Sequence, residues 1–286
     1  MPFQTRTIAV ATCQRLGNKP DTDFGVVAGQ LQDVGVDLAF IPWNEQRQWG
    51  DFAACIVKAT WDYIDEPEQF IRWVNQTNGQ TKVFNDSDSI CWNVHKAYLL
   101  ELNSSGVPTV PTIIVPRDTP HETRPWAEPP WEEIVVKPAI SVGGLRTQRF
   151  AEDLHEARRF IDTLLATGDV LIQPFVPSIL TEGETSIVYI DGALSHAVSK
   201  RVPVGGFAAQ RSLGARIEVC SPHPREVELA AKALRLVPPT LFARVDIVWF
   251  EGCPVVMEVE LIEPALFLDL VPEAAGRLVA AIAARV

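Results

Sequence analysis

The segment from Phe242 to Leu261 constrains the fold most, because it predicts a β-hairpin that carries acidic side chains on one face. Two runs rich in β-forming residues flank a Glu-Gly turn, and side chains alternate between the two faces of a strand. A turn centred near Gly252 therefore sets specific residues opposite one another. This register predicts the cross-strand pairs Asp246–Glu258 and Arg244–Glu260.

The acidic face of this hairpin needs a compensating charge. Like charges directly opposite on two strands repel each other. The reverse face is apolar and suits burial, with Val245, Ile247, Val259 and Leu261. Mg²⁺ prefers carboxylate oxygens and nucleotide phosphates as ligands, so the pattern indicates Mg²⁺ and nucleotide-phosphate chemistry. The predicted metal ligands are Asp246, Glu258 and Glu260, and the alternative for Asp246 is a structural ion pair with Arg244 or a neighbouring lysine.

Composition and charge exclude several classes of function. The formal net charge is -11, so no basic surplus exists to bind nucleic acid or an anionic membrane surface. No apolar run approaches the roughly 20 residues of a membrane span, and the N-terminus lacks the apolar core of a signal peptide. The five cysteines form no C-x-x-C pair, which disfavours a zinc site. We therefore expect a cytoplasmic protein.

The N-terminal part predicts a small parallel sheet. Strands expected over 7–12, 37–42 and 54–58 alternate with helices around 26–31 and 67–74. Ligands of such sheets bind beyond the carboxyl ends of the strands. The candidate substrate contacts are Gln14, Arg15, Thr60, Trp61 and Asp62, although Trp61 fits a packing role beneath that edge equally well.

The middle of the chain places two lysines near a glycine-rich turn. A helix is expected over 93–102, with Asn93 as its N-cap, and it carries Lys96. An apolar strand over 134–138 includes Lys137, and Ser141 to Gly144 follow as a flexible turn. A helix over 154–165 comes next. For Lys96 alone, a solvated surface position is the simpler interpretation.

The pattern changes to antiparallel strands from Val170 onward. Asp191-Gly192 lies between two alternating runs and predicts a hairpin. A two-residue turn there sets Glu184 on the same face as Ser199 and Arg201. Of the neighbouring pair Lys200 and Arg201, this register selects Arg201 as the ligand candidate.

The order of these weak signals along residues 90 to 270 resembles the ATP-grasp superfamily, especially its glutathione-synthetase-like and RimK-like branch. The resemblance rests on Lys96, the Lys137-Pro138 strand end before Gly143-Gly144, Gln173 to Val176, Gly183-Glu184, Arg201, Asp246 and Glu258-Val259-Glu260. It implies an α/β plus α+β chain, namely an ATP-grasp fold preceded by a parallel-sheet α/β domain. The expected domains are 1–92 for substrate, 93–169 as central lid and 170–286 with the antiparallel sheet and metal site.

The resemblance also implies roles for individual residues. Lys96 and Lys137 contact ATP phosphates, and Ser141, Gly143 and Gly144 close over them. Gln173, Pro174, Phe175 and Val176 hold adenine, and Glu184 reaches the ribose. Arg201 binds the transferred phosphoryl group, and Asp246, Glu258 and Glu260 hold one or two Mg²⁺ ions. Arg211 is a candidate for stabilising an acyl phosphate or else a surface arginine, and Glu263 either orients an amine or is a helix N-terminal acid.

Two departures from the family pattern bear on the substrate. Glu260 stands where the family often has asparagine, and Ser186 stands where glutathione synthetase has arginine. The segments Ala59 to Tyr63, Thr181 to Ser186 and Glu260 to Phe267 resemble a subgroup that includes a D-cycloserine-forming cyclo-ligase.

The resemblance implies an ADP-forming ligase that joins a small-molecule carboxylate to an amine, either as a single chain or as a homo-oligomer. Within this class the alternative is cyclisation of O-ureidoserine. The alternative from another class is a non-catalytic nucleotide-binding protein, against which the three opposed acids argue.

Overall fold

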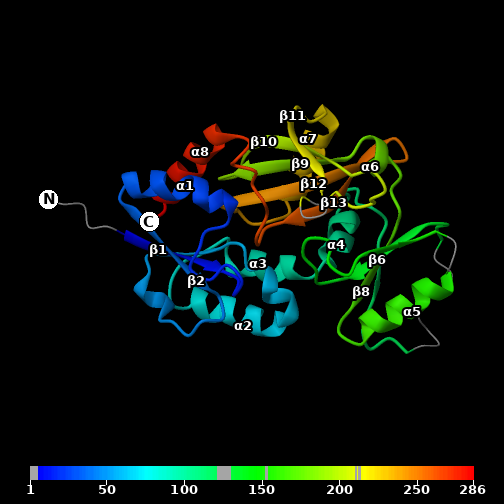
Figure 1. Ribbon diagram of the computed structural model, residues 1–286, viewed down its shortest axis with the longest axis horizontal. Helices are drawn as coiled ribbons and strands as arrows, with labels where there is room; N and C mark the ends of the chain where they lie inside the picture. Colours follow the sequence, from blue (N-terminus) through cyan, green and yellow to red (C-terminus); the bar gives the residue numbers. More distant parts are fainter. Residues whose placement is uncertain (1–5, 121–129, 152–153, 210, 212–213) are drawn as a thin grey trace.

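The computed structural model describes residues 6–120, 130–151, 154–209, 211 and 214–286. These residues form three sheets (Figure 1). A parallel sheet and a lid sheet lie toward opposite ends of the long axis, and a five-stranded sheet runs along the upper side between them. Among the described residues, no helix has the length and apolar character that a membrane crossing requires.

The N-terminal sheet has the strand order β2-β1-β3-β4, and all its pairings are parallel, as predicted. Asp21 caps the first helix by accepting a hydrogen bond from the Phe24 N–H. The elements are β1 (Arg6–Thr12), α1 (Thr22–Asp33), β2 (Val36–Pro42), the 3-10 turns η1 (Trp49–Asp51) and η2 (Trp61–Asp65), β3 (Cys55–Val57), α2 (Pro67–Asn78) and β4 (Val83–Phe84).

Two short helices, α3 (Ser87–Val94) and α4 (Tyr98–Ser104), replace the single helix predicted over 93–102. Asn93 is not an N-cap. It lies near the end of α3, where its side-chain amide donates to the Val259 carbonyl and accepts from the Leu261 N–H, both at 2.8 Å. The chain breaks at Lys96, whose N–H bonds the Ala139 carbonyl instead of continuing the helix.

The lid sheet has the order β5-β8-β6-β7 with antiparallel pairings. Apolar side chains of α5 pack against it. Its elements are β5 (Ile113–Val115), β6 (Ile134–Pro138), β7 (Gln148–Phe150), α5 (Leu154–Leu165) and β8 (Val170–Pro174). The domain boundary predicted after residue 169 cuts this sheet, because β8 returns after α5 to pair between β5 and β6.

The five-stranded sheet has the order β11-β10-β9-β12-β13 and is antiparallel throughout. An apolar core joins α7 to this sheet, and another joins β9 to α1 and α8, so the blue and red helices lie together in Figure 1. The elements are α6 (Ser178–Thr181), β9 (Glu184–Ile190), β10 (Ala193–Arg201), β11 (Arg216–Cys220), α7 (Pro224–Leu234), β12 (Phe242–Phe250), β13 (Cys253–Glu260) and α8 (Pro272–Ala283).

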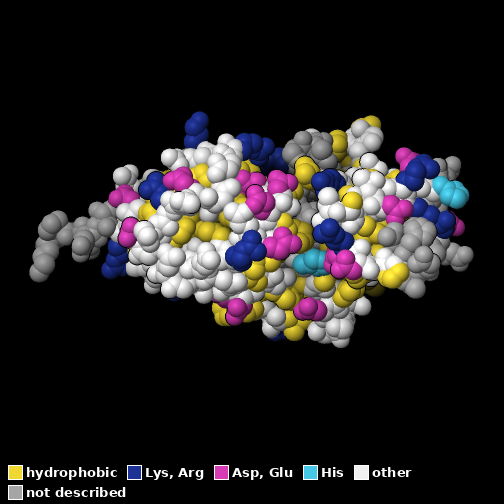
Figure 2. Space-filling model, turned by 90° about the horizontal axis from the view of Figure 1, so that it is seen from below, with side chains coloured by type: hydrophobic (Ala, Val, Ile, Leu, Met, Phe, Trp, Pro, Cys, Tyr) yellow, Lys and Arg dark blue, Asp and Glu magenta, His cyan; other side chains and the backbone are white. Residues whose placement is uncertain are grey.

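Figure 2 shows the lower face, on which basic and acidic side chains are interspersed and no continuous basic surface forms. This distribution agrees with the excess of acidic over basic residues in the chain.

Candidate active site

One cavity lies where the three sheets approach one another. Its walls come from η2, the α3–α4 break, the lid strands β6 and β8, the hairpin β12–β13 and the loop after β13. The predicted site residues that line it are Trp61, Lys96, Lys137, Ser141, Gly143, Gly144, Gln173, Pro174, Phe175, Val176, Glu184, Asp246, Glu258, Glu260 and Glu263. Most of the predicted site is therefore brought together in space.

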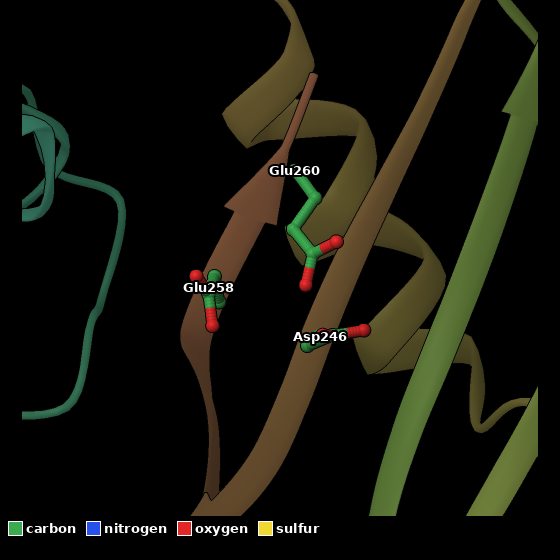
Figure 3. Close-up of side chains that lie close together, drawn as sticks. All are labelled: Asp246, Glu258 and Glu260. Atoms are coloured by element: carbon green, nitrogen blue, oxygen red, sulfur yellow. The ribbon is translucent and has the colours of Figure 1, made fainter. Parts of the chain in front are cut away.

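The β12–β13 hairpin forms the predicted pairs, with Asp246 opposite Glu258 and Arg244 opposite Glu260, and a bulge between Asp246 and Ile247 shifts the pairing by one residue nearer the turn. Its turn residues Glu251 and Gly252 both have positive φ, as a tight two-residue turn requires. One oxygen from each of the three acids lies within 4.8 Å of the others (Figure 3). The predicted apolar reverse face is buried as well.

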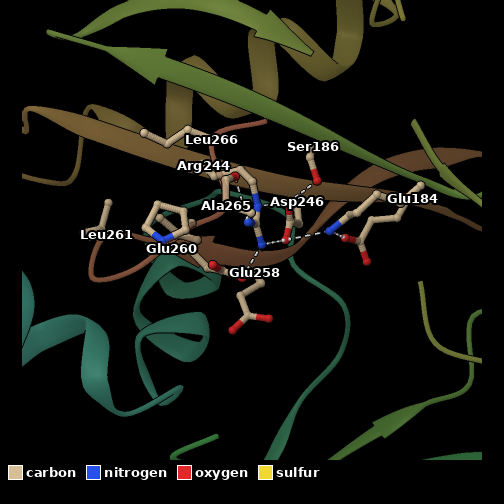
Figure 4. A network of polar contacts seen from close by, with 12 residues as sticks. Glu184, Ser186, Arg244, Asp246, Glu258, Glu260, Leu261, Ala265 and Leu266 are labelled. Carbon is tan, nitrogen blue, oxygen red and sulfur yellow. Dashed lines mark hydrogen bonds and ion pairs between the residues drawn. The ribbon is translucent and has the colours of Figure 1, made fainter. Parts of the chain in front are cut away.

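The acid Asp246 is already paired with protein groups. Its oxygens accept from Arg244 Nε and Nη2, both at 2.9 Å, and from Ser186 Oγ at 2.5 Å, with Lys200 Nζ at 3.2 Å (Figure 4). Burial alone raises the pKa of a carboxyl group, but the charges of Arg244 and Lys200 outweigh it and hold the pKa of Asp246 far below its ordinary value. An internal ion pair thus coexists with the acidic cluster.

Among the residues that the structure describes, Glu258 and Glu260 each pair through one oxygen only. Lys96 Nζ lies 2.9 Å from Glu258 Oε1, and Arg244 pairs with Glu260 Oε1. Burial raises the pKa of both acids, but Lys96 and Lys137 bring that of Glu258 below its usual value, whereas Glu258 and Asp246 help to keep that of Glu260 raised.

A divalent cation fits this donor set. Within the described residues, the second oxygen of both Glu258 and Glu260 has no protein hydrogen-bond partner. Mg²⁺ is commonly held by one or two carboxylates together with substrate phosphates, and oxygen-only donors do not favour zinc or copper. Glu258 and Glu260 are therefore better placed for a cation than Asp246, which already faces two protein cations.

Lys200, not Arg201, shares the face of Glu184, and the predicted register of β9–β10 is wrong at this point. A bulge between Leu194 and His196 shifts the pairing by one residue, so Lys200 lies opposite Glu184. The Lys200 ammonium is buried and pairs with Glu184 and Asp246. Arg201 is exposed and donates to the Thr181 carbonyl outside the cavity.

Glu184 is buried in this cluster, and its burial raises its pKa to about 7 in spite of the opposing charge of Lys200. Arg211 lies outside the cavity lining. It is exposed and pairs with Asp269 at 3.1 Å, which agrees with the surface interpretation of that residue.

The lid supplies a second cationic group to the cavity. Lys137 extends from β6, and burial together with the charge of Lys96 lowers its pKa, against the pull of Glu258. Lys96 Nζ donates to the Ser141 carbonyl at 2.8 Å, which ties the glycine-rich turn to the acidic hairpin. Gly143 and Gly144 have φ of 60° and 73°, a conformation that favours glycine.

The end of strand β8 forms another wall of the cavity. The Gln173 amide donates to Thr112 Oγ1 at 2.9 Å, and the guanidinium of Arg149 lies 3.7 Å from the ring centre of Phe175. These contacts fix the strand end from Gln173 to Val176 along one wall of the cavity.

Of the predicted loop residues in the N-terminal domain, only Trp61 lines the cavity. Asp62 accepts from the Gln14 N–H and from Trp43 Nε1, and the guanidinium of Arg15 lies 5.4 Å from the Trp61 ring centre. Thr60 is buried. Gln14, Arg15, Thr60 and Asp62 therefore surround Trp61 rather than line the cavity themselves.

Sequence reasoning missed several lining or supporting residues. Arg244 is not among the predicted site residues, yet it lines the cavity and pairs with both Glu260 and Asp246, the latter being the alternative stated for Asp246. Tyr63, two residues after Trp61, could have been found from its place in the same loop. No sequence signal marked Phe207, Ala208 and Ala209, which also line the cavity.

Comparisons with known proteins agree with this geometry. Residues 8–85 match the family model described as the N-terminal domain of D-cycloserine synthetase DcsG. A curated relative, the cycloserine biosynthesis protein DcsG of Streptomyces lavendulae, is 29% identical over 283 residues, covering 93% of this chain and 94% of that protein.

Solved structures extend the likeness to nearly the whole chain. The crystal structure of D-cycloserine synthetase DcsG superposes with a TM-score of 0.86 at 27% identity, covering 98% of this chain and 99% of the other. D-alanine–D-alanine ligase from Bacillus anthracis, complexed with ATP, gives 0.67 at 16% identity over 97% and 96%. The ATP-grasp ligase PsnB, with a minimal precursor, Mg and ADP, gives 0.62 at 17% identity over 98% of both chains.

The fold is therefore the ATP-grasp fold, and the solved structures that share it include the ligases PsnB and D-alanine–D-alanine ligase. Within that class the chain is similar to D-cycloserine synthetase DcsG over both its parallel-sheet domain and its remaining sheets.

Proposed function

We propose that this chain is an ATP-dependent ligase that activates a small-molecule carboxylate as an acyl phosphate and joins it to an amine, releasing ADP and phosphate. The observation that carries the proposal is the meeting of Lys96, Lys137, Glu258 and Glu260 in one cavity. Transfer of a phosphoryl group to a carboxylate brings two anions together, so it depends on positioned cations more than on acid-base catalysis.

Each group has a proposed task in this reaction. Lys96 and Lys137 contact the phosphates of ATP, and Gln173 to Val176 receive the adenine. Arg244, buried beside Asp246 and Glu260, stabilises negative charge on the transferred group in place of the exposed Arg201 and Arg211. Glu258 and Glu260 would hold Mg²⁺, which supplies charge neutralisation of the phosphates when bound.

The turn Ser141, Gly143 and Gly144 closes over the phosphates in this proposal. Its backbone already accepts a hydrogen bond from Lys96 at Ser141, so closure would carry that lysine with it. Slow hydrogen exchange there without nucleotide, unchanged by ATP, would argue against a closing turn.

The similarity to D-cycloserine synthetase favours a second, narrower candidate, in which carboxylate and amine belong to one molecule and the product is a ring. O-ureidoserine is the substrate to try first. Mass spectrometry of the product separates ring closure from joining of two molecules.

A nucleotide assay tests the general proposal. Purified protein is incubated with Mg²⁺, ATP and single or paired amino acids, including O-ureidoserine, and the nucleotide products are separated. The proposal expects ADP and orthophosphate that depend on the added substrate. Release of pyrophosphate would overturn the acyl-phosphate route, and tight ATP binding without turnover on any substrate would favour a non-catalytic nucleotide-binding protein.

A further inference from the structure

The cavity has one acid that forms no ion pair within the described residues. Asp246, Glu184, Glu258 and Glu260 each pair with a lysine or an arginine. Glu263 also lines the cavity and is half-buried, yet across the described residues its carboxylate has no hydrogen-bond or ion-pair partner. Lys96 and Lys58 act on it only through their charges, so a ligand in the cavity can bond to it directly.

A second polar group lies unpaired in the same wall. Tyr63 is only 3% exposed and lines the cavity, and in the described part of the chain its hydroxyl has no hydrogen-bond partner. Burial and the negative charges of Glu263, Glu258 and Glu260 raise the pKa of Tyr63. Tyr63 and Glu263 line the same cavity, so both side chains are available to a ligand there. Two polar groups without a protein partner in one cavity wall point to a ligand that bonds to both.

The backbone around Glu263 is held in place from the N-terminal domain. The buried Lys58 Nζ donates to the Pro264 carbonyl at 2.7 Å and pairs with Asp21 at 2.7 Å. Asp23 accepts from the N–H groups of Leu266 and Leu268 at 2.7 and 3.0 Å. This network fixes the segment that follows β13, so the position of Glu263 in the cavity wall is built into the fold.

The charges of the cavity decide which ligand group fits there. An ionised carboxylate only accepts hydrogen bonds, and a second carboxylate beside it would be repelled. A protonated amino group supplies both positive charge and N–H donors. Lys96 and Lys137 contact the ATP phosphates in the proposed reaction, so the substrate carboxylate that receives the phosphoryl group lies on their side of the cavity. A substrate that reaches from there to Glu263 carries both a carboxylate and an amino group.

From this arrangement we infer that Glu263 and Tyr63 bind the free amino group of an amino-acid substrate. The inference rests on the proposed ligase function and adds the recognition of the substrate class. Burial and the nearby charge of Glu260 raise the pKa of Glu263 to about 8, and a bound ammonium group would favour its ionised form.

Binding measurements on matched probes test the inference. The probes are glycine, D-alanine, D-serine and O-ureido-D-serine, each compared with its N-acetyl derivative by calorimetry, with and without Mg²⁺ and a non-hydrolysable ATP analogue. In the wild type we expect at least one free amino acid to bind about tenfold or more tightly than its acetylated form. Glu263→Gln should reduce that ratio to near one, and Tyr63→Phe should reduce it partly.

The control variant is Glu68→Gln, on the exposed first turn of α2, which should keep the wild-type ratio. Persistence of the preference in Glu263→Gln, or its absence from every probe pair in the wild type, would overturn the inference. The nucleotide analogue separates this failure from failure of the ligase proposal. Unchanged nucleotide binding with no amino preference rejects only the role of Glu263, whereas an amino preference without any nucleotide binding rejects the ligase.

Discussion

The two hairpins β9–β10 and β12–β13 have similar turns, but only β12–β13 forms the strand pairs that the sequence predicts near the cavity. Asp191-Gly192 and Glu251-Gly252 all have positive φ, and each hairpin has a bulge between its turn and the cavity. In β12–β13 the predicted pairs form. In β9–β10 the bulge brings Lys200 to the place expected for Arg201. A turn sequence thus fixes register only as far as the first irregularity of the strands.

The cationic side chains of the candidate site differ in burial from the arginines that were predicted to act there. Lys200 and Arg244 are 3% and 5% exposed and lie between carboxylates. Arg201 and Arg211 lie on the surface. A buried cation needs partners, whereas a surface arginine contributes little to stability. The comparison predicts large effects at the buried pair and small effects at the exposed pair.

Lys200→Met should give the largest loss of stability. It leaves Glu184 and Asp246 without their shared lysine, and removing one member of a buried ion cluster costs about 3–5 kcal/mol. Arg201→Met, at the adjacent exposed position, should change the free energy of unfolding by less than about 1 kcal/mol. Urea unfolding of both variants measures the difference, and equal losses would refute the assigned register.

Arg244→Met compared with Arg211→Met tests the same contrast in catalysis. Loss of a positioned donor to developing negative charge lowers turnover by roughly 100-fold or more. The exposed Arg211 should matter less than threefold. Steady-state ADP release measures both, with circular dichroism to confirm that each variant is folded. A larger loss for Arg211 would restore it as the group that stabilises the acyl phosphate.

Glu263 gives a smaller, pH-dependent effect. Its pKa of about 8 lies above the ordinary 4.5, so the folded protein binds this proton more tightly than the unfolded chain. Its contribution to stability is complete below pH 4.5 and is lost as the pH rises through about 8. Relative to Glu263→Gln, the wild type should therefore lose unfolding free energy between pH 5.5 and 8.5. If the unfolding free energies of the two proteins change with pH in the same way, Glu263 has an ordinary pKa.

The sequence pattern predicted most of the elements because burial and turn chemistry act locally. The strand over 134–138, the helix over 154–165 and the acidic hairpin are found where expected. The resemblance to the ATP-grasp superfamily predicted how these strands and helices are arranged around one site. Local patterns could not supply the break at Lys96, because that residue bonds Ala139 in a distant segment.

The errors share one physical cause, which is that long-range contacts outweigh local preference. Asn93 suits an N-cap by residue type, but its amide instead bonds the backbone of the β13 end. The boundary expected after residue 169 separates β8 from the lid, whereas β8 pairs with β5 and β6 within the lid sheet. The sequence offered Glu260 and Asp246 as separate partners for Arg244, and the structure pairs its guanidinium with both at once.

The central claim is that Glu258 and Glu260 hold a cation together with nucleotide phosphates. Calorimetry of a non-hydrolysable ATP analogue, with and without Mg²⁺, tests it in wild type, Glu258→Gln and the surface control Glu68→Gln. The account predicts that Mg²⁺ strengthens binding about tenfold or more in the wild type and the control, and that Glu258→Gln loses this gain together with Mg²⁺-dependent turnover. Nucleotide affinity indifferent to Mg²⁺ in the wild type, or an undiminished gain in Glu258→Gln, would contradict the account.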